Sequence, residues 1–165
     1  MSTKIDGKVF PDKIHLIDLK VFKSNLETTD DFLSNPVKPV GFNFGFSQRS
    51  GFNFENNQVR IVINILLQGM KSENEPVGIK AEYGFDFRYI VDNLKDFVIK
   101  GKDKKKTVSG KLGITLISIA YSSTRGIVLE RTQGTYLNGI ILPIIDPKEL
   151  LTGNLNIPQL NIGSD

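Results

Sequence analysis

Alternation between apolar and polar residues predicts two long β-strands in the middle of the chain. From Val77 to Val91 the odd positions are mainly apolar or aromatic, and the even positions are mainly glycine, charged or polar. A period of two gives a strand one dry face and one wet face. Val59–Leu67 repeats the pattern, and the polar stretch K-S-E-N-E-P between the two segments predicts a turn. We therefore expect a long hairpin that includes a strand over Glu75–Val91.

Two more strands are expected upstream of this hairpin. Ile14–Phe22 is the first, with apolar residues on alternate positions. The segment Ser24–Lys38 is rich in Asp, Asn and Pro, which indicates a long crossover loop. An Arg-Ser turn is expected before the short segment Gly51–Phe54. The strand Pro39–Gln48 precedes that turn and places three rings on one face: Phe42, Phe44 and Phe46. Four strands joined mainly by hairpins predict an antiparallel sheet with one apolar face.

The segment Ser109–Gln133 is predicted to be the helix that covers this sheet. Two neighbouring apolar stripes at helical spacing indicate burial on more than one side: Leu112, Leu116, Ile119, Ser123 and Ile127, and beside them Ile114, Ile117, Tyr121 and Val128. Many β-branched residues work against the helix, because they favour strands. A strip of small residues recurs every four positions, either for core packing or as a helix–helix contact between subunits: Ser118, Ser122 and Gly126.

The residues after this helix predict an extended link and a second, short helix. Gly134 suits a helix end, and Pro143 favours an extended backbone over Tyr136–Ile145. Asp146 can cap a helix whose first residue is a proline, with Leu150 and Leu151 as its apolar face. These boundaries predict one domain over 14–152, between a flexible N-terminus over 1–13 and a flexible tail over 153–165.

Composition is that of an ordinary globular protein. The chain has 165 residues, of which 39% are hydrophobic and 24% charged, which fits a single domain that buries about 70% of its unfolded surface. The absence of cysteine excludes disulfides and thiolate metal sites. The N-terminal residues lack the apolar core of a signal peptide, and no apolar run approaches the ~18 residues of a membrane span. We therefore expect a cytoplasmic protein.

Positive charge is concentrated in one run. Five lysines and one aspartate between residues 100 and 106 carry more positive charge than the net +3 of the whole chain. Such a run is either a solvated loop or a contact for nucleic acid or a membrane. No aromatic residue lies within it to stack on bases. The run consists of Lys100, Lys102, Lys104, Lys105 and Lys106, with Asp103.

Enzyme motifs are not found in the sequence. No G-x-S-x-G elbow, Walker A loop or dinucleotide fingerprint occurs. The single histidine, His15, is expected to be a partly exposed strand residue. Ser122–Thr124 is rich in hydroxyls but has no identifiable base partner. Glu27, Asp30 and Asp31 could bind a hard cation, although a solvated loop explains them better. We expect neither catalysis nor a cofactor.

Taken in order, these elements resemble the SecB export chaperone family. The closest likeness is in Arg131–Leu151, R-T-Q-G-T-Y-L-N-G-I-I-L-P-I-I-D-P-K-E-L-L, which is similar to the family's helix end, its Leu-x-Pro link and its second helix. The stretch V-F-K-S-N-L-E through Val40 resembles its first strand and crossover, and Val59–Phe87 its third and fourth strands. The resemblance covers about Leu19–Leu151. It implies an α+β fold, with a four-stranded antiparallel sheet covered by one long helix and a short C-terminal helix.

For function, the resemblance implies a homotetramer, a dimer of dimers with the long helices at its centre. It also implies that unfolded polypeptides bind in apolar grooves under the crossover and the second helix. Apolar burial is non-directional, so such grooves can accept many sequences. Each matching residue has an alternative role in the core. The matching positions are Phe32, Leu33, Ile141, Leu142, Leu150 and Leu151, and the weaker candidates are Phe22, Phe42, Phe44 and Phe46.

The resemblance does not decide which protein receives or supplies the bound polypeptide. Family members that deliver clients to the SecA motor carry an acidic sheet surface, whereas here Glu82 and Asp86 alternate with Lys80 and Arg88. The lysine-bearing connection 94–107 is also longer than usual. Other SecB-like proteins serve as dedicated antitoxin chaperones. We expect an ATP-independent holdase for export; the alternatives are an antitoxin chaperone, a structural or small-ligand binding module, and a nucleic-acid binder.

Overall fold

Four long strands form one antiparallel sheet in the computed structural model, which describes all residues except 1–6, 102, 104, 154, 156–159 and 162–165. The strands are β1 (Ile14–Thr28), β2 (Gly41–Asn53), β3 (Gln58–Ser72) and β4 (Glu75–Val91). Their order is β1-β4-β3-β2, and a two-residue strand, β7 (Leu160–Asn161), follows β2 at the edge.

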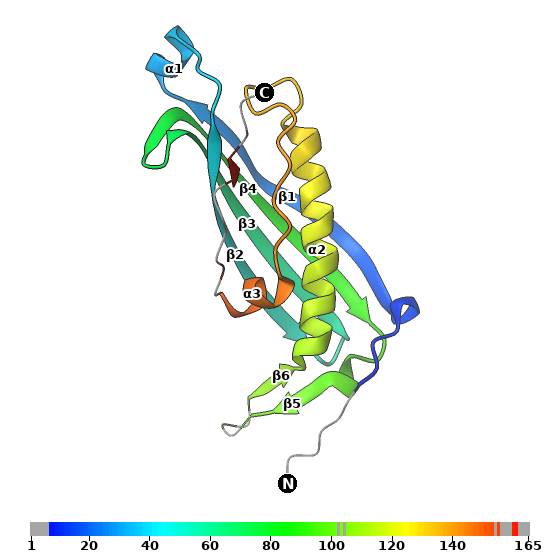
Figure 1. Cartoon of the computed structure of the whole chain (residues 1–165). Helices are drawn as coiled ribbons and strands as arrows, with labels where there is room; N and C mark the ends of the chain where they lie inside the picture. The colour runs from blue at the N-terminus through cyan, green and yellow to red at the C-terminus, as the bar shows by residue number, and fades with distance from the viewer. Residues whose placement is uncertain (1–6, 102, 104, 154, 156–159, 162–165) are drawn as a thin grey trace.

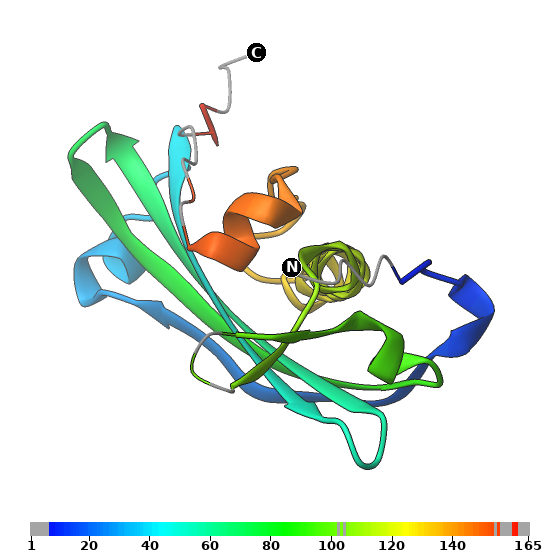
Figure 2. The ribbon, with the colours of Figure 1, turned by 90° about the horizontal axis from the view of Figure 1, so that it is seen from below.

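The helices confirm the expected α+β architecture. The long helix α2 (Gly110–Arg131) crosses one face of the sheet, and the short helix α3 (Pro147–Thr152) lies beside it over β2. Seen along the sheet, α2 and α3 are on the same side, and neither covers the other face of the sheet (Figure 2). We call these the helix face and the outer face.

The β3–β4 hairpin forms the centre of the core, as its alternation predicts. The odd residues of β4 from Ile79 to Val91 point to the helix face and are buried. Neighbouring rings among them pack 6.4 Å apart from centroid to centroid, along Tyr83, Phe85, Phe87 and Tyr89. Opposite them on β3, the buried partners are Ile61, Ile63 and Ile65. Burying these large apolar side chains is the main favourable term in folding.

The first strand is longer than predicted. β1 pairs with β4 as far as Thr28, opposite Ile79, so only a short crossover remains before β2. That crossover contains a one-turn helix, α1 (Asp30–Ser34). Thr29 caps it, because its Oγ1 accepts a hydrogen bond from the amide of Phe32 at 3.2 Å. The expected long loop is therefore partly strand and partly helix.

The predicted turn at Arg49-Ser50 is wrong. β2 continues through it, with Arg49 opposite Val62 and Ser50 opposite Ile61. An unbroken partner strand holds these residues in register, although Gly and Ser are frequent in turns. The chain turns after Asn53 instead, and Asn57 there adopts a positive φ of 54°.

Helix α2 packs one side against the sheet. Its buried residues are Leu112, Leu116, Ile117, Ala120, Tyr121, Thr124 and Val128. By length and hydropathy α2 is also apolar enough to cross a membrane. Burial of one side against a sheet is what a core helix shows. The helix ends at Arg131, and Gly134 (φ 72°) lies two residues beyond its C-cap, Thr132.

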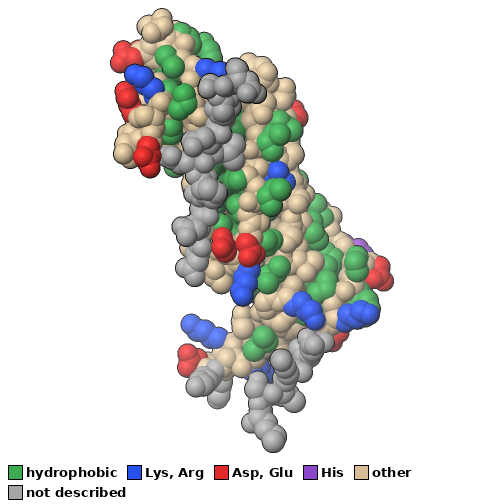
Figure 3. Space-filling model, in the orientation of Figure 1, with side chains coloured by type: hydrophobic (Ala, Val, Ile, Leu, Met, Phe, Trp, Pro, Cys, Tyr) green, Lys and Arg blue, Asp and Glu red, His purple; other side chains and the backbone are tan. Residues whose placement is uncertain are grey.

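The lysine run belongs to a small hairpin between β4 and α2. A 3-10 helix (Leu94–Phe97) leads into β5 (Val98–Lys100), which pairs with β6 (Lys106–Val108). Leu94 and Phe97 are buried and anchor the base of this hairpin. Figure 3 shows several basic side chains at this end of the molecule, whereas acidic side chains are spread from the end near α1 to the lower end. Lys102 and Lys104 fall outside the described residues.

Of the two termini predicted to be flexible, residues 1–6 and most of 153–165 are outside the described part of the chain. Pro11–Lys13 forms a 3-10 helix before β1. Beyond α3, the half-buried Leu155 packs against the core. The two residues of β7 pair with Gly41 and Phe42.

Candidate polypeptide-binding surface

A row of phenylalanines follows the helix face of β2. The ring centroids of Phe42 and Phe44 are 6.3 Å apart, and those of Phe44 and Phe46 are 6.0 Å apart. Phe46 meets the ring of Tyr121 on α2 edge to face at 5.8 Å. Phe42 is buried, whereas Phe44 and Phe46 are half-buried. The row therefore begins in the core and becomes accessible along β2, which is the last long strand on one side of the sheet.

Helix α3 crosses above this row. Asp146 caps it by accepting a hydrogen bond from the Lys148 amide at 2.9 Å, and Gly153 ends it with a φ of 76°. The side chain of Gln48 on β2 donates to the carbonyl of Leu151 at 3.2 Å and so ties α3 to the strand. Leu150 is buried beneath the helix, whereas Leu151 is half-buried at its edge. The short capped helix thus agrees with its sequence prediction.

A groove of 590 Å³ lies on the other side of α3. Its apolar walls come from Phe52 on β2, Val108 at the end of β6 and Leu151 on α3. The first turn of α2 forms its floor, where Gly110 and Gly113 present no side chain. Polar residues, among them Gln48 and Ser50, also line this groove. Phe44 and Phe46 do not line it, but they lie on the same face of β2, and we call the groove and these two rings together the β2 groove.

The link between the helices alternates between buried and exposed side chains. Three residues of the link are buried: Leu137, Ile140 and Leu142. The relative solvent exposure of Tyr136, Ile141 and Ile144 is 53%, 55% and 86%. Sequence reasoning named Ile141 but not Tyr136 or Ile144. The missed signal for Ile144 was the alternation from Ile140 onward, since an extended backbone points successive side chains to opposite sides. Tyr136 lies instead in a series of turns over 132–139, where an extended link was predicted.

The crossover is anchored to the tip of β4. The amide of Thr29 donates to the carbonyl of Gly78 at 2.8 Å, and Gly78 has a φ of 97°. Phe32 is buried and meets Tyr136 edge to face at 5.0 Å, whereas its neighbour Leu33 is exposed. Of the two crossover residues expected to bind polypeptide, only Leu33 is accessible.

Four of the predicted binding residues are core side chains. Phe32, Phe42, Leu142 and Leu150 each have at most 5% of their surface exposed, so in this conformation they cannot line an accessible groove. The reason is that the crossover and the link fold back onto the sheet and bury their alternate residues. The predicted residues left accessible on the helix side are Leu33, Phe44, Phe46, Ile141 and Leu151.

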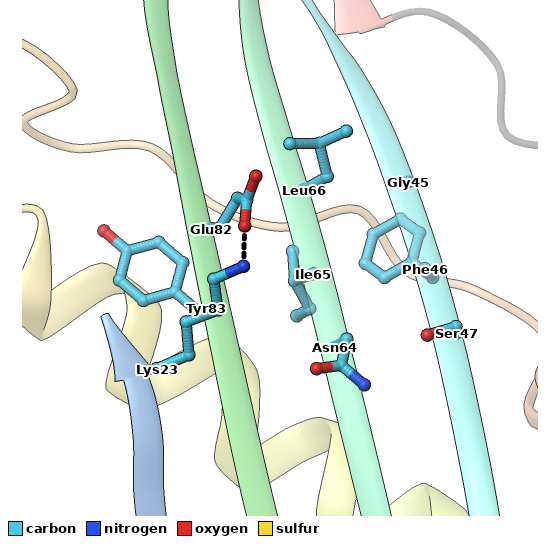
Figure 4. A pocket seen from close by; sticks show the side chains of 9 residues that line it. All are labelled: Lys23, Gly45, Phe46, Ser47, Asn64, Ile65, Leu66, Glu82 and Tyr83. Atoms are coloured by element: carbon cyan, nitrogen blue, oxygen red, sulfur yellow. Dashed lines mark hydrogen bonds and ion pairs between the residues drawn. The ribbon is translucent and has the colours of Figure 1, made fainter. Parts of the chain in front are cut away.

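Phe22 lies on the opposite side of the sheet from this row. It alternates with Val21, which packs against the core, and its ring covers Gly84, where an added Cβ would come within 2.6 Å of that ring. Figure 4 shows the outer face nearby, a cavity of 310 Å³ to which Leu66 contributes and across which Lys23 and Glu82 form an ion pair. Phe22 and the phenylalanine row therefore cannot contact the same ligand segment.

Charges on the outer face are paired. Arg60 holds both carboxylate oxygens of Asp86, through Nε at 2.9 Å and a terminal nitrogen at 2.8 Å. The hydrogen bond from Arg60 lowers the pKa of Asp86, although burial acts in the opposite direction. Arg88 lies 3.6 Å from the same carboxylate, and Lys80 pairs with Glu27 at 3.2 Å. The outer face therefore carries positively and negatively charged side chains next to one another.

The small-residue strip faces away from the sheet. Ser122 and Gly126 are exposed, and Ser118 is half-buried and donates its hydroxyl to the carbonyl of Ile114 at 2.7 Å. A Cβ added at Gly126 would meet nothing within 4 Å. Close to the strip, Ile119 is also exposed. The strip is therefore free for a contact outside the protomer.

The residues that could take part in catalysis or bind a metal were also located in the structure. His15 is a half-exposed residue of β1, and its Nε2 lies 3.1 Å from a carboxylate oxygen of Asp92. Among the described residues, no three His, Asp or Glu side chains gather as a metal site requires. Burial raises the pKa of Tyr89 and of Tyr121, which keeps both phenols protonated at neutral pH.

Comparisons with known proteins give a likeness of structure only. No family model matches the chain, and no curated protein matches it. Among solved structures, the chain resembles the Mycobacterium tuberculosis Rv1957 SecB-like chaperone in complex with a ChAD peptide from the Rv1956 HigA1 antitoxin. The TM-score is 0.58 and the identity 11%, over 81% of this chain and 91% of that one. A Streptococcus agalactiae protein of unknown function aligns at a TM-score of 0.33 and 12% identity, over 79% of this chain and 97% of that one. The chain therefore has a SecB-like fold.

Proposed function

We propose that this protein is an ATP-independent chaperone that binds unfolded polypeptides in the β2 groove. The observation that carries the proposal is the set of half-buried apolar side chains along an open strand edge: Phe44, Phe46, Phe52 and Leu151. The sheet and α2 already enclose a large core without them. Apolar side chains that stay partly in water beside a groove favour a ligand that covers them.

The chemistry of the groove suits ligands of many sequences. Contact with apolar side chains contributes about 25 cal/mol per Å² of surface removed from water, whatever the order of residues in the ligand. Binding and release then need neither a catalytic group nor a nucleotide. The SecB-like fold supports this function, and so does the exposure of Leu33 and Ile141 on the segments that border the sheet.

The proposed assembly is a cytoplasmic homotetramer, a dimer of dimers joined through α2. Its contact would be the strip Ser118, Ser122 and Gly126, together with the exposed Ile119. Small residues let two helix backbones approach closely, and the strip lies on the side of α2 that the sheet leaves uncovered. The clients would therefore reach the β2 groove from outside, while α2 lies at the centre.

An antitoxin is the second candidate for the client. The structural neighbour with a SecB-like fold holds an antitoxin peptide, which supports a dedicated client of this kind. Delivery to SecA for export receives less support, because Glu82 and Asp86 on the outer face are each paired with a basic side chain. An acidic docking surface needs free carboxylates, and these two are already neutralised.

Light scattering tests the chaperone proposal. Reduction of insulin causes its B chain to aggregate, and we expect stoichiometric amounts of this protein to suppress that aggregation without ATP. Phe44→Ser removes one half-buried ring from the β2 groove and should weaken client binding about tenfold, since ~60 Å² of lost apolar contact corresponds to about 1.5 kcal/mol. Phe22→Ser is the matched control, because it removes an exposed ring from the outer face.

Two results would refute the proposal. One is the absence of suppression by the wild-type protein at a stoichiometric ratio. The other is equal weakening by Phe44→Ser and Phe22→Ser, because the two rings lie on opposite faces of the sheet and cannot share one site. Circular dichroism of both variants would verify that each remains folded.

A further inference from the structure

Two arginines lie directly opposite each other on the outer face of the sheet. Arg60 on β3 is in register with Arg88 on β4, and these two strands are the inner pair of the four long strands (Figure 1). Like charges that lie opposite each other on antiparallel strands repel, so such a pair needs a counter-charge. Asp86, which is 8% exposed, supplies this charge from the same face. One carboxylate is therefore shared by two guanidinium groups.

The shared carboxylate satisfies only one of the two arginines. Arg60 donates two hydrogen bonds to Asp86, whereas the nearest approach of Arg88 is 3.6 Å, which is too long for a hydrogen bond. Asp18 lies opposite Arg88 on β1, but it pairs with Lys20 at 3.4 Å. Three basic side chains and two carboxylates are thus grouped here. Within the described part of the chain, this group has one positive charge more than its carboxylates neutralise.

A cavity of 400 Å³ opens at these guanidinium groups. Arg60 and Arg88 line it together with the amide side chains of Asn53 and Gln58, and none of its described lining residues is acidic. The Oδ1 atom of Asn53 already accepts hydrogen bonds from two backbone amides of the β2–β3 turn, each at 3.2 Å. The amino group of Asn53 is therefore the part left for a ligand. The cavity is rich in hydrogen-bond donors and suits an oxyanion.

The same cavity has an apolar wall. Ile17 lines it from β1 and is 49% exposed. Gly51 lines it from β2, and a Cβ added there would meet nothing within 4 Å. An aliphatic side chain therefore borders the donors, and the glycine leaves room beside them. This combination suits a ligand in which a carboxylate and an apolar side chain are close together.

We propose that this cavity binds a carboxylate of an acidic peptide segment, with an apolar side chain of the same segment against Ile17. The bound carboxylate would accept hydrogen bonds from Arg88 and from the donors of Arg60 that Asp86 leaves unused. Two carboxylates and two guanidinium groups would then alternate. The cavity would select such a segment from a partner protein by its charge and by its neighbouring apolar residue.

The charge of the group favours a carboxylate over a phosphate. A single carboxylate neutralises the one positive charge in excess, whereas a phosphate monoester carries about −1.5 to −2 at neutral pH. The site also lies on the opposite face of the sheet from Phe44 and Phe46, so it does not depend on the proposed chaperone function. Both arginine side chains are about half exposed. Exposed ion pairs are weak and screened by salt, so we expect a millimolar Kd for one carboxylate.

An NMR titration of the full chain with N-acetyl-leucine tests the site directly. This probe carries one carboxylate and one apolar side chain, and the side-chain N–H signals of arginine report on the guanidinium groups. We expect the signals of Arg60 and Arg88 to shift, and the Kd to rise severalfold between about 20 and about 200 mM NaCl. N-acetyl-leucinamide has the same side chain without the charge and should not shift them. Equal shifts with both compounds would overturn the proposal.

Substitution of Arg88 locates the binding. Arg88→Gln removes the less satisfied arginine and keeps the Arg60–Asp86 pair, and it should weaken binding about tenfold because a hydrogen bond between charged groups is lost. Arg88→Lys keeps the charge without the planar fork and should recover part of the affinity. Lys80→Gln is the matched control, since Lys80 pairs with Glu27 and does not line the cavity. An unchanged Kd for Arg88→Gln in a protein with wild-type circular dichroism would overturn the site.

Two peptides identify the source of the carboxylate. Acetyl-Leu-Glu-Leu-amide carries only a side-chain carboxylate, and acetyl-Leu-Gln-Leu-amide is its neutral control. Binding of the glutamate peptide alone among these two supports an acidic side chain, whereas binding of N-acetyl-leucine without the glutamate peptide supports a C-terminal carboxylate. If neither carboxylate probe binds at up to about 50 mM, the proposal fails. Inorganic phosphate that binds more tightly than both at equal ionic strength would make this a phosphate site and also overturn it.

Discussion

The hydroxyl of Tyr121 donates a hydrogen bond of 2.7 Å to the backbone carbonyl of Pro143. One turn further along α2, Nε of Arg125 donates to the carbonyl of Leu142 at 2.9 Å. The two carbonyls belong to the extended link, so helix side chains take the place of a neighbouring strand. The link is thereby fixed along α2 with Leu142 buried and Ile141 exposed.

Replacing Tyr121 by Phe should loosen this attachment. The variant leaves the carbonyl of Pro143 without its donor, and we expect the free energy of unfolding to fall by about 1 kcal/mol. Urea denaturation followed by fluorescence measures the change. Tyr136→Phe is the control, since Tyr136 is 53% exposed and its hydroxyl should matter little. Equal losses in both variants would show that the Tyr121 hydrogen bond does not hold the link.

Stability should decrease in alkaline solution because of the buried phenols. Burial raises the pKa of Tyr89 and Tyr121. Above pH ~10, the ordinary pKa of tyrosine, the unfolded chain loses these protons while the folded chain keeps them. The unfolded state then binds fewer protons, so stability is fully present below pH ~10 and declines as the pH rises further. Urea titrations between pH 8 and 11 should show this slope, and Tyr89→Phe should reduce it; an unchanged slope would contradict the assignment.

The pairing of Asp86 with Arg60 should stabilise the fold above acidic pH. The two hydrogen bonds hold the pKa of Asp86 below its usual range. The stabilisation is therefore present above pH ~4, the ordinary pKa of an aspartate, and is lost as the pH falls through the lower folded value. Asp86→Asn should lower the free energy of unfolding at pH 6. It should also reduce the dependence of this free energy on pH below ~4, as measured by urea denaturation at several pH values. Glu27→Gln, at an exposed ion pair, should have a smaller effect.

A bulky residue on the α2 strip should disrupt the proposed tetramer and leave the protomer folded. A Cβ added at Gly126 would meet nothing within 4 Å. Leucine also has a higher helix propensity than glycine, so the substitution should stabilise the folded protomer by up to ~1 kcal/mol. Light scattering after gel filtration should give a lower mass for Gly126→Leu than for the wild type. Gly110→Leu, at another helical glycine with open space around it, is the matched control. A monomeric wild type would refute the assembly.

Neutralising the lysine run should leave client binding intact. The described lysines of the run, Lys100, Lys105 and Lys106, belong to the β5–β6 hairpin, and none of them lines the β2 groove. Glutamine at all five lysines should therefore not change the Kd for unfolded lactalbumin. A nucleic-acid binder would instead lose its affinity for a labelled oligonucleotide, with a steep dependence on salt in the wild type. Tight, salt-sensitive oligonucleotide binding would favour that alternative.

The period of two over Glu75–Val91 predicted β4 with its observed bounds, because residues that bury one face of a central strand must alternate. Asp146 and Pro147 likewise marked α3, since capping is a local interaction between neighbouring residues. The surface was predicted less well. Phe42 and Phe44 belong to the same row, yet one is buried and the other half-buried, and nothing in their local sequence separates them.

By itself, the sequence determined the elements whose cause is local: the alternation of the strands and the caps of α3. The extended link predicted over Tyr136–Ile145 was correct only in its later part, because turns over 132–139 precede it. Only the tertiary structure decided that β2 passes unbroken through Arg49-Ser50, that β1 pairs with β4 as far as Thr28, and that Leu160 and Asn161 return to pair with the start of β2. The physical reason is the range of the interactions. Periodicity and capping act between residues a few positions apart, whereas register, exposure and edge pairing depend on strands that are distant in the sequence and meet only in the folded chain.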